Sequence, residues 1–287
     1  MRPSHVAALL LLAAPVAAQA LLIRHDVPDA RYRVDASAFP PLVDMPGSGH
    51  GVLIAPQWVV TAAHTIQGDV DAVMIGGVAR KVTRIIVHRG YRQMPDDLVH
   101  RALASGDGRE AQQFLAQNDD IALLQLAQPV SDITPARIHD GGRRIGKTLW
   151  LIGKGATGTG ETGIAPGSPE RGVLRQGFNR VMSDDGRWLV YDFTRGPGAH
   201  RLEAMTGNGD SGSPALVRDG KGWAVAGLAS WKGGTTDLRQ PAGRYGFTSV
   251  NVRLAHYADW IAEVQRGADP RTARSAPRSP GSARRQS

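Results

Sequence analysis

Short apolar segments separated by turn residues run along most of the chain, and this pattern limits the possible folds more than any other feature. About a dozen such segments lie between residues 49 and 250, at the regular spacing that is typical of antiparallel sheets. Long amphipathic helices do not alternate with them, which argues against the repeated strand–helix–strand units of parallel sheets. The 35 glycines and 18 prolines agree with many tight turns. The sequence therefore predicts an all-β fold of antiparallel barrels or sandwiches.

A predicted hairpin in the first half of the chain leads to a histidine. Residues 49–54 form one strand, a turn follows, and residues 58–61 form the returning strand. His64 comes directly after this hairpin, next to two small residues. A histidine in such a place is more often structural than catalytic, so a catalytic role needs partners elsewhere in the chain.

A helical segment and an acidic pair follow. Residues 92–117 favour helix by propensity and by apolar spacing, which indicates a surface insertion with one or two short helices. Asp119 and Asp120 then stand at the start of an apolar run that ends at Leu126. Such a run is typical of a strand that is buried on both faces. An acid at its start is either a loop residue or a buried, paired carboxylate.

A glycine-rich loop surrounds a serine in the second half of the chain. Residues 206–214 spell TGNGDSGSP, with Ser211 among small residues. Glycines let the backbone turn tightly and bring its N–H groups close to a ligand. A serine hydroxyl is a weak nucleophile and needs a base and an oriented partner. Farther on, the apolar spacing predicts a terminal helix over residues 252–264.

The two ends of the chain have compositions unlike the body. Residues 1–20 have the charged start, the apolar run and the small-x-small site of a secretory signal peptide. The apolar run is too short for a mature membrane-spanning helix, although a retained anchor is an alternative. We therefore expect a secreted or periplasmic protein without membrane association after signal removal. Residues 267–287 form a basic tail that we expect to be disordered.

Composition excludes several classes of site. The net charge is +8, and part of it lies in the tail. No basic stripe is interleaved with aromatic residues, so nucleic acid is not a predicted partner. The absence of cysteine excludes disulfides, thiolate metal sites and a cysteine nucleophile. We predict no metal and no organic cofactor. Six further histidines lack metal-ligand spacing and are expected at the surface or in loops: His25, His88, His100, His139, His200 and His256.

Three motifs stand in the order His, Asp, Ser: TAAH ending at His64, DIALL beginning at Asp120, and GDSG around Ser211. Together they resemble the trypsin-like (chymotrypsin-fold) serine peptidases. The likeness extends over residues 23–264. It implies an all-β fold of two antiparallel six-stranded β-barrels with a C-terminal helix. The cysteine-free chain behind a signal suggests an exported bacterial member without disulfides. The α/β-hydrolase elbow G-x-S-x-G does not fit, because residue 213 is serine.

The resemblance also implies a division of the chain into domains. The expected parts are a signal peptide (1–20), an N-terminal β-barrel (21–135) with the helical insertion at about 92–117, a C-terminal β-barrel with the terminal helix (136–266), and the basic tail (267–287).

The family likeness assigns a role to each motif residue. Ser211 is the expected nucleophile, and His64 is the base that accepts its proton and later returns it. Asp120 is the acid that orients the imidazole. Asp119 is an open alternative, although the family places its acid directly before Ile-Ala-Leu. The backbone N–H groups of Gly209 and Ser211 are the expected oxyanion hole.

The likeness implies a substrate-binding strand and a modified specificity pocket. Ser230 is expected to hydrogen-bond to the buried acid, and the backbone of Ser230, Trp231 and Lys232 to pair with the substrate. Met205 stands where the tryptic subfamily has an acid. Lys232 and Tyr245 replace glycines of the pocket wall. We therefore expect a small or apolar side chain before the scissile bond, not Arg or Lys.

Activation and a missing crosslink complete the likeness. Family members often form a new α-amino group that pairs with the acid before the nucleophile, here Asp210. We expect cleavage to expose a residue within Leu21–Ile23, and a site preformed without this step is the alternative. One disulfide of the family corresponds to His50 and Thr65.

The sequence thus predicts an exported serine endopeptidase that cleaves polypeptide substrates through an acyl-enzyme. A catalytically weak binding protein with the same fold is one alternative, and a serine esterase with the same three residues is another. The sequence makes no prediction about the oligomeric state.

Overall fold

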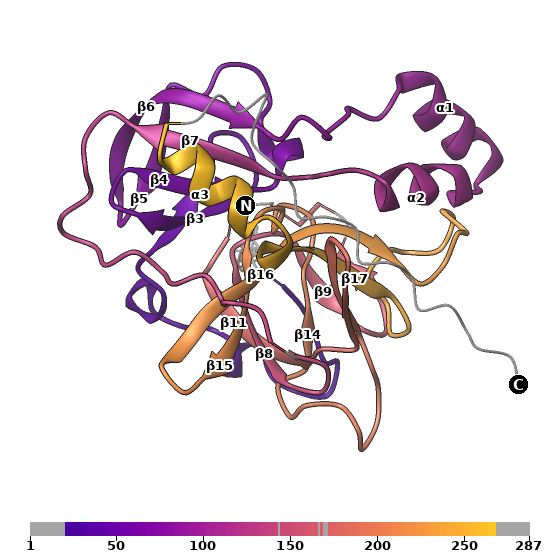
Figure 1. The fold of residues 1–287 in the computed structure, drawn as a ribbon. Helices are drawn as coiled ribbons and strands as arrows, with labels where there is room; N and C mark the ends of the chain where they lie inside the picture. Colours follow the sequence, from indigo (N-terminus) through magenta and orange to yellow (C-terminus); the bar gives the residue numbers. More distant parts are fainter. Residues whose placement is uncertain (1–20, 143, 166, 169–171, 268–287) are drawn as a thin grey trace, which may run out of the picture.

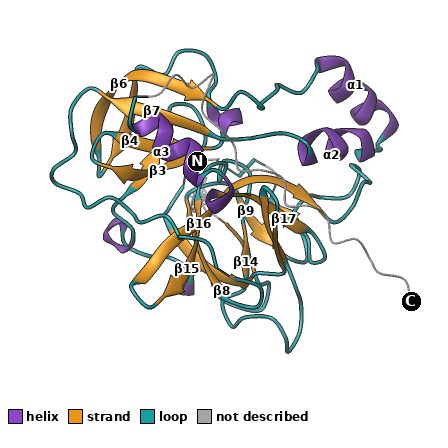
Figure 2. Cartoon of the chain, viewed as in Figure 1, coloured by secondary structure: helices purple, strands orange, loops and turns teal. Residues whose placement is uncertain are grey.

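The structure is a computed structural model that describes residues 21–142, 144–165, 167–168 and 172–267. The predicted signal peptide and all but the first residue of the predicted basic tail lie outside this part of the chain. Two β-rich halves lie side by side, and a pair of helices projects from one edge (Figure 1). Strands make up most of the regular structure (Figure 2).

The first half contains a closed barrel in which every neighbouring pair of strands is antiparallel, in the order β2-β3-β4-β7-β6-β5. Alternating apolar side chains fill its interior, among them Val43, Leu53, Val59 and Leu124, which are fully buried. Its strands are β2 (Leu42–Asp44), β3 (His50–Ala55), β4 (Trp58–Thr61), β5 (Ala72–Ile75), β6 (Val78–Val87) and β7 (Ala122–Leu126).

The second half is built on a curled seven-stranded antiparallel sheet in the order β11-β8-β15-β16-β17-β13-β12. Its strands are β8 (Thr148–Gly153), β11 (Arg175–Arg180), β12 (Ser183–Asp185), β13 (Trp188–Asp192), β15 (Pro214–Asp219), β16 (Gly222–Gly233) and β17 (Thr248–Arg253).

A small four-stranded sheet adds the N-terminal segment to this half. Its order is β10-β9-β1-β14, with β1 parallel to β9 and antiparallel to β14. Its strands are β1 (Leu21–Ile23), β9 (Thr157–Thr159), β10 (Gly163–Ile164) and β14 (Ala204–Met205). The predicted all-β architecture, with a six-stranded antiparallel barrel in the first half and a C-terminal helix, is confirmed. The second half differs from a simple six-stranded barrel, because its strands divide between these two sheets.

Helices are few in the described residues. The α-helices are α1 (Asp96–Ser105), α2 (Arg109–Ala116) and α3 (Ala258–Gln265), and 3₁₀ turns cover Asp29–Arg31, Ala36–Ala38, Ala63–Thr65 and Leu254–His256. The predicted start of the terminal helix at residue 252 is wrong. Val252 and Arg253 continue β17, because they pair with neighbouring strands of the sheet. None of the described helices is long and apolar enough to cross a membrane.

The largest apolar cluster joins the two halves. Leu123 of the barrel, Leu216 of the sheet and Trp260 of α3 all belong to it. This packing holds the faces that carry the candidate site residues against each other. Two of the remaining histidines lie outside helices and strands, as expected, but are buried. His88 packs against the Trp260 ring, and His139 contacts Arg144.

Candidate active site

His64 lies in the 3₁₀ turn that follows β4, and hydroxyl groups hold this turn in place. Thr61 Oγ1 donates to His50 O at 2.6 Å and lies 2.9 Å from Thr65 Oγ1. Thr65 Oγ1 also donates to Ala62 O at 2.8 Å. His50 and Thr65 are the positions that the family resemblance associates with a disulfide. A buried hydrogen-bond network therefore connects these two positions in a chain that has no cysteine.

Asp120 lies immediately before β7 and is buried against His64. Its Oδ1 accepts from His64 N at 2.9 Å, and its Oδ2 lies 2.7 Å from His64 Nδ1. Ser230 Oγ donates to the same Oδ2 at 2.5 Å. A carboxylate only accepts hydrogen bonds, so Nδ1 of His64 carries a proton. In neutral histidine the other nitrogen, Nε2, is then an acceptor.

The two groups shift each other's pKa. Burial alone lowers the pKa of His64, but the charge and hydrogen bond of Asp120 outweigh it and raise that pKa above 6.5. Burial alone raises the pKa of Asp120, but His64 and the Ser230 hydroxyl outweigh it and lower that pKa below 3.8. The pair therefore favours an ionised carboxylate beside an imidazole that accepts protons readily.

Asp119 faces another part of the molecule. Its carboxylate accepts from Tyr257 Oη at 2.8 Å and lies 3.1 Å from the Arg187 guanidinium. His88 Nδ1 lies 3.4 Å away. The structure thus places Asp120, and not Asp119, against the imidazole of His64.

Ser211 brings the second half of the chain to this pair. Its Oγ lies 2.7 Å from His64 Nε2, and its carbonyl accepts from His50 N at 2.7 Å, which joins the serine loop to the barrel. Gly212 follows with φ of 75°, and a Cβ there would lie 2.1 Å from His50 O. Only glycine fits this approach of two backbones.

Two amides beside the serine have no acceptor within the described residues. Neither Gly209 N nor Ser211 N donates a hydrogen bond there, whereas Gly212 N and Ser213 N both do. Gly209 has φ of 80°, a left-handed conformation that favours glycine. The loop therefore holds two unused donors close to the serine hydroxyl.

Asp210 points away from the site into the protein and is fully buried. Its carboxylate accepts from Gly155 N at 2.8 Å, from Gly207 N at 2.7 Å and from the backbone of Leu21. Burial raises the pKa of Asp210 to about 6, and these backbone donors oppose that rise. Gly155 was not among the predicted site residues, although the Gly-Lys-Gly sequence around it is a signal of a close backbone approach.

The predicted substrate strand lies beside the serine loop. Ala229 O accepts from Gly212 N at 2.8 Å, and Ser230 reaches Asp120 as described above. Trp231 packs edge to face on Trp188, with ring centres 6.0 Å apart. Lys232 Nζ lies 3.3 Å from Asn208 Oδ1, so its side chain reaches back toward the serine loop.

The predicted pocket residues lie behind the serine loop. Met205 is fully buried and pairs with Leu22 of β1. Tyr245 is half-buried, packs on Phe193 with ring centres 4.8 Å apart, and its Oη lies 2.9 Å from His25 Nδ1. Met205 and Tyr245 thus add apolar and aromatic atoms to the apolar cluster of the second half.

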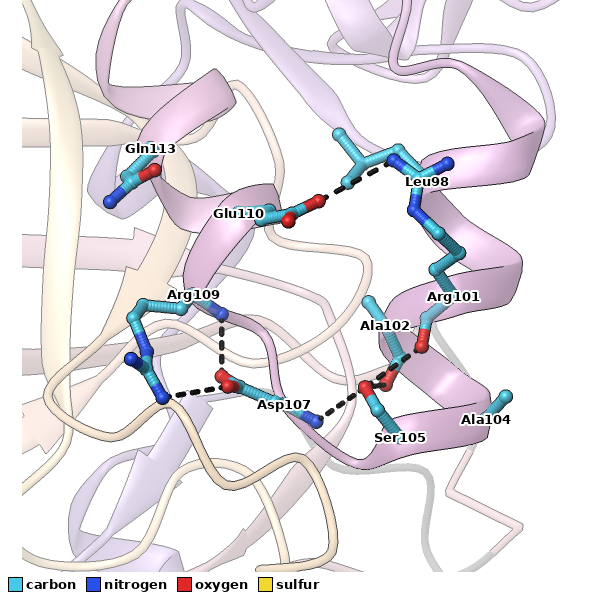
Figure 3. A pocket seen from close by; sticks show the side chains of 9 residues that line it. All are labelled: Leu98, Arg101, Ala102, Ala104, Ser105, Asp107, Arg109, Glu110 and Gln113. Carbon is cyan, nitrogen blue, oxygen red and sulfur yellow. Dashed lines mark hydrogen bonds and ion pairs between the residues drawn. The ribbon is translucent and has the colours of Figure 1, made fainter.

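A large groove lies elsewhere. This groove has a volume of about 740 Å³, lies between α1 and α2 and is lined by residues of the helical insertion (Figure 3).

No cluster of histidine, aspartate or glutamate in the described part of the chain is arranged to hold a metal ion. The candidate site itself joins a hydroxyl, an imidazole and a carboxylate, and a serine with a base and an oriented acid can act as a nucleophile.

Comparisons with known proteins agree with this geometry. The trypsin family model matches residues 32–261. The complement C1s subcomponent of Sus scrofa is 26% identical over 234 residues, covering 75% of this chain and 31% of that protein. The chain thus spans less than a third of that relative's length. The solved structure of neuropsin, a serine protease expressed in the limbic system of mouse brain, has a TM-score of 0.60 at 18% identity, covering 82% of this chain and 98% of that chain. At 18% identity, this similarity shows that the two chains share a fold.

Proposed function

The chain belongs to the trypsin family of serine peptidases, and we propose that it is an exported serine endopeptidase, secreted or periplasmic, acting on polypeptide substrates. The observation that supports this most is the hydrogen-bond chain from Ser211 Oγ through His64 to Asp120. The hydroxyl has a base, and the base has an orienting carboxylate, as a nucleophilic serine requires. The mechanism needs no metal or organic cofactor.

The acylation step uses each of these groups. Ser211 Oγ attacks the carbonyl carbon of the peptide bond while its proton passes to His64 Nε2. The carbonyl oxygen becomes an oxyanion, which accepts from the free amides of Gly209 and Ser211. The C–N bond then breaks as His64 gives its proton to the leaving amine, and an ester remains on Ser211. Asp120 stays ionised and stabilises the imidazolium.

Deacylation repeats the step with water. His64 takes a proton from the water, the resulting hydroxide adds to the ester carbonyl, and the same two amides stabilise the oxyanion. The C–O bond to Ser211 then breaks as His64 returns the proton to Oγ. The products are a carboxylic acid and the regenerated hydroxyl.

Labelling of the serine tests this function directly. A fluorophosphonate should modify Ser211 in the correctly processed protein, and Ser211→Ala should abolish labelling. The same variant should lower kcat by about 10⁶, as loss of the nucleophile does in comparable sites. Absence of labelling in the processed protein would falsify the enzymatic proposal.

Activation is proposed to occur by cleavage before Leu21. The backbone of Leu21 already hydrogen-bonds to the buried Asp210 carboxylate, and β1 is fully paired between β9 and β14. Cleavage at this point would convert the Leu21 amide into an α-ammonium group in contact with Asp210. A buried carboxylate is much more stable beside a cation than without one.

The backbone of Leu21 supports the same cleavage point. Leu21 has φ of 61°, and it is the one non-glycine residue in the described chain with positive φ. This conformation is unfavourable for a bulky side chain inside a chain. A first residue has no preceding carbonyl, so cleavage before Leu21 would relieve the conflict.

Determination of the mature N-terminus tests this activation. We expect the mature chain to begin at Leu21. A start beyond Asp26 in the fully active protein would contradict it, because β1 and its contact with Asp210 would then be lost.

The side-chain preference is proposed to be small or apolar before the scissile bond. Met205 and Tyr245 place apolar and aromatic atoms behind the serine loop, and neither supplies a negative charge to pair with Arg or Lys. Cleavage of a peptide library by the mature protein tests this. Dominant cleavage after Arg or Lys would overturn it.

A further inference from the structure

The helical insertion, residues 92–117, contacts the loop that follows β16 (Figure 1). The contacts come from the turn between its two helices and from α2. Three hydrogen bonds join the two segments: Gly108 N to Thr236 O (2.7 Å), Leu238 N to Gly106 O (2.8 Å), and Gln112 Nε2 to Thr235 O (2.5 Å).

The C-terminal end of α2 is also hydrogen-bonded to the start of β13. Trp188 Nε1 donates to Ala116 O at 3.0 Å, and the Arg187 guanidinium donates to Gln117 O at 2.6 Å. Trp188 in turn packs edge to face on Trp231. The insertion therefore lies against the far end of the predicted substrate strand instead of projecting freely into solvent.

β16 continues beyond the point where its pairing with β15 ends. β15 pairs with β16 only as far as Leu228, and two further hydrogen bonds join Ala229 to the serine loop. From Trp231 to Gly233, β16 is paired with β17 on one edge. Ser230–Gly233 is the stretch expected to pair with substrate, and about four substrate residues match its length at about 3.3 Å each.

From these contacts, and resting on the proposed peptidase function, we propose that the helical insertion closes the cleft on the N-terminal side of the scissile bond. A substrate paired antiparallel to β16 has the residue before the scissile bond near Ser230 and earlier residues toward Gly233. A fifth residue would meet the loop at Thr235, which is already bound by Gln112. Bonds within about four residues of a free amino terminus are therefore cleaved fastest.

The insertion is held by these anchors and has only a small core of its own, formed by the buried Leu98 and Ala102 of α1. α2 contains no buried residue, and the groove between the helices is lined largely by polar and charged side chains (Figure 3). The helices are linked by an ion pair between Arg101 and Glu110 at 3.4 Å. At its base, Arg92 N donates to Asn118 Oδ1 and Asn118 Nδ2 donates back to Arg92 O, both at 2.7 Å. These two hydrogen bonds form a closed neck at the base of the insertion, so the insertion can be removed without opening the barrel.

A series of peptides of two to eight residues with free amino termini, all with the same preferred residue before a fluorogenic leaving group, tests the proposal. For the mature protein, kcat/KM should rise up to four residues, because each added residue gains pairing with β16. It should then fall by about tenfold or more at six and eight residues, because the added chain meets the insertion.

Two kinds of variant locate the effect. Replacing residues 93–117 with a short Gly-Ser linker, which keeps the Arg92–Asn118 neck, should remove the fall at six and eight residues. If that variant does not fold, Gln112→Ala combined with Trp188→Phe removes two anchors and should reduce the fall. Gln113→Ala is the matched control, because Gln113 lines the groove and should leave the length profile unchanged.

The outcomes separate this proposal from the proposed function. Equal rates for four and eight residues, with Ser211 labelled by fluorophosphonate, would overturn the closed cleft alone. The same would follow if the linker variant were active and still discriminated against long peptides. Loss of both labelling and cleavage of every peptide would overturn the proposed function, and this inference with it.

Discussion

The two halves of the molecule hold their parts of the site in different ways. The N-terminal half is a closed barrel, and it positions His64 and Asp120 mainly through contacts within itself, with one hydrogen bond from Ser230 of the other half. The C-terminal half positions the Ser211 loop through Asp210, whose carboxylate reaches the N-terminal strand β1. The base and acid therefore depend on local packing, whereas the nucleophile and its amides depend on a segment from the other end of the chain.

The buried carboxylates Asp120 and Asp210 show the same difference between the two halves. Asp120 has His64 as a partner that can carry charge, and its pKa is lowered. Asp210 is held by three backbone donors, and burial raises its pKa to about 6. The first carboxylate is stable as an anion without processing of the chain. The second needs a cation, which a free α-amino group at Leu21 would supply.

Of the two buried carboxylates, Asp120 on the barrel side should give the larger effect on rate when its charge is removed. Asp120→Asn keeps the shape of the side chain but allows it to donate to His64 Nδ1, which favours the wrong tautomer. We expect kcat to fall by about 10⁴, as in comparable sites. Steady-state kinetics on a short peptide measures this. Asp119→Asn is the control, and an equal loss in that variant would show that the assignment of the orienting acid is wrong.

Removing the charge of Asp210, on the C-terminal side, should lower the rate less than removing the charge of Asp120. Asp210→Asn removes the charge that the α-ammonium group of Leu21 would pair with, and the Gly209 amide would lose its fixed position. We expect kcat/KM to fall by about 10²–10³, the range seen when one oxyanion donor is lost. An unchanged rate would indicate a site that forms without N-terminal insertion.

The same carboxylate predicts a pH dependence of stability. Without an amine, the pKa of Asp210 is raised from 3.8 to about 6 in the folded state. Its favourable contribution is then complete below pH 3.8 and is lost as the pH rises through 6, by about 3 kcal/mol. A chain blocked from cleavage before Leu21 should lose thermal stability between pH 4 and 7 relative to the processed chain. Equal Tm profiles for the two forms would contradict this.

His64 predicts the acid limb of activity. Because Asp120 raises the pKa of His64, the imidazole stays protonated at a pH where an isolated histidine is already neutral. Only the neutral form accepts the proton of Ser211, so kcat/KM should fall tenfold per pH unit below a midpoint that lies above 6.5. A pH–rate profile with its midpoint below 6.5 would show that another group controls the limb.

Local motifs were sufficient to predict the fold and to propose the site residues. The order of His64, Asp120 and Ser211, each within a short recognisable motif, identified the family before any distance was known. Such motifs survive in sequence because the chemistry needs those side chains in a fixed backbone setting. The all-β fold followed from short apolar segments in the same way.

Features that depend on distant pairing could not be predicted. Val252 continues a strand because it pairs with Trp188, although its local sequence favours a helix. The contact between Gly108 and Thr236 joins residues that are distant in the chain, and no periodicity indicates it. The burial of His88 depends on the position of α3, which only the packed structure shows. Tertiary contacts decide these positions over local propensity.

The smallest predicted effect concerns the crosslink that the barrel lacks. Thr65→Val removes a buried hydroxyl that donates to Ala62 O and lies 2.9 Å from Thr61 Oγ1, while preserving the shape of the side chain. We expect the free energy of unfolding to fall by about 1–2 kcal/mol, because buried polar partners lose their bonds. Urea titration measures this, and Thr83→Val on the exposed barrel surface is the control. Equal losses in both variants would mean that the network around His64 does not replace a crosslink, and the closed barrel alone would then account for the stable position of the base.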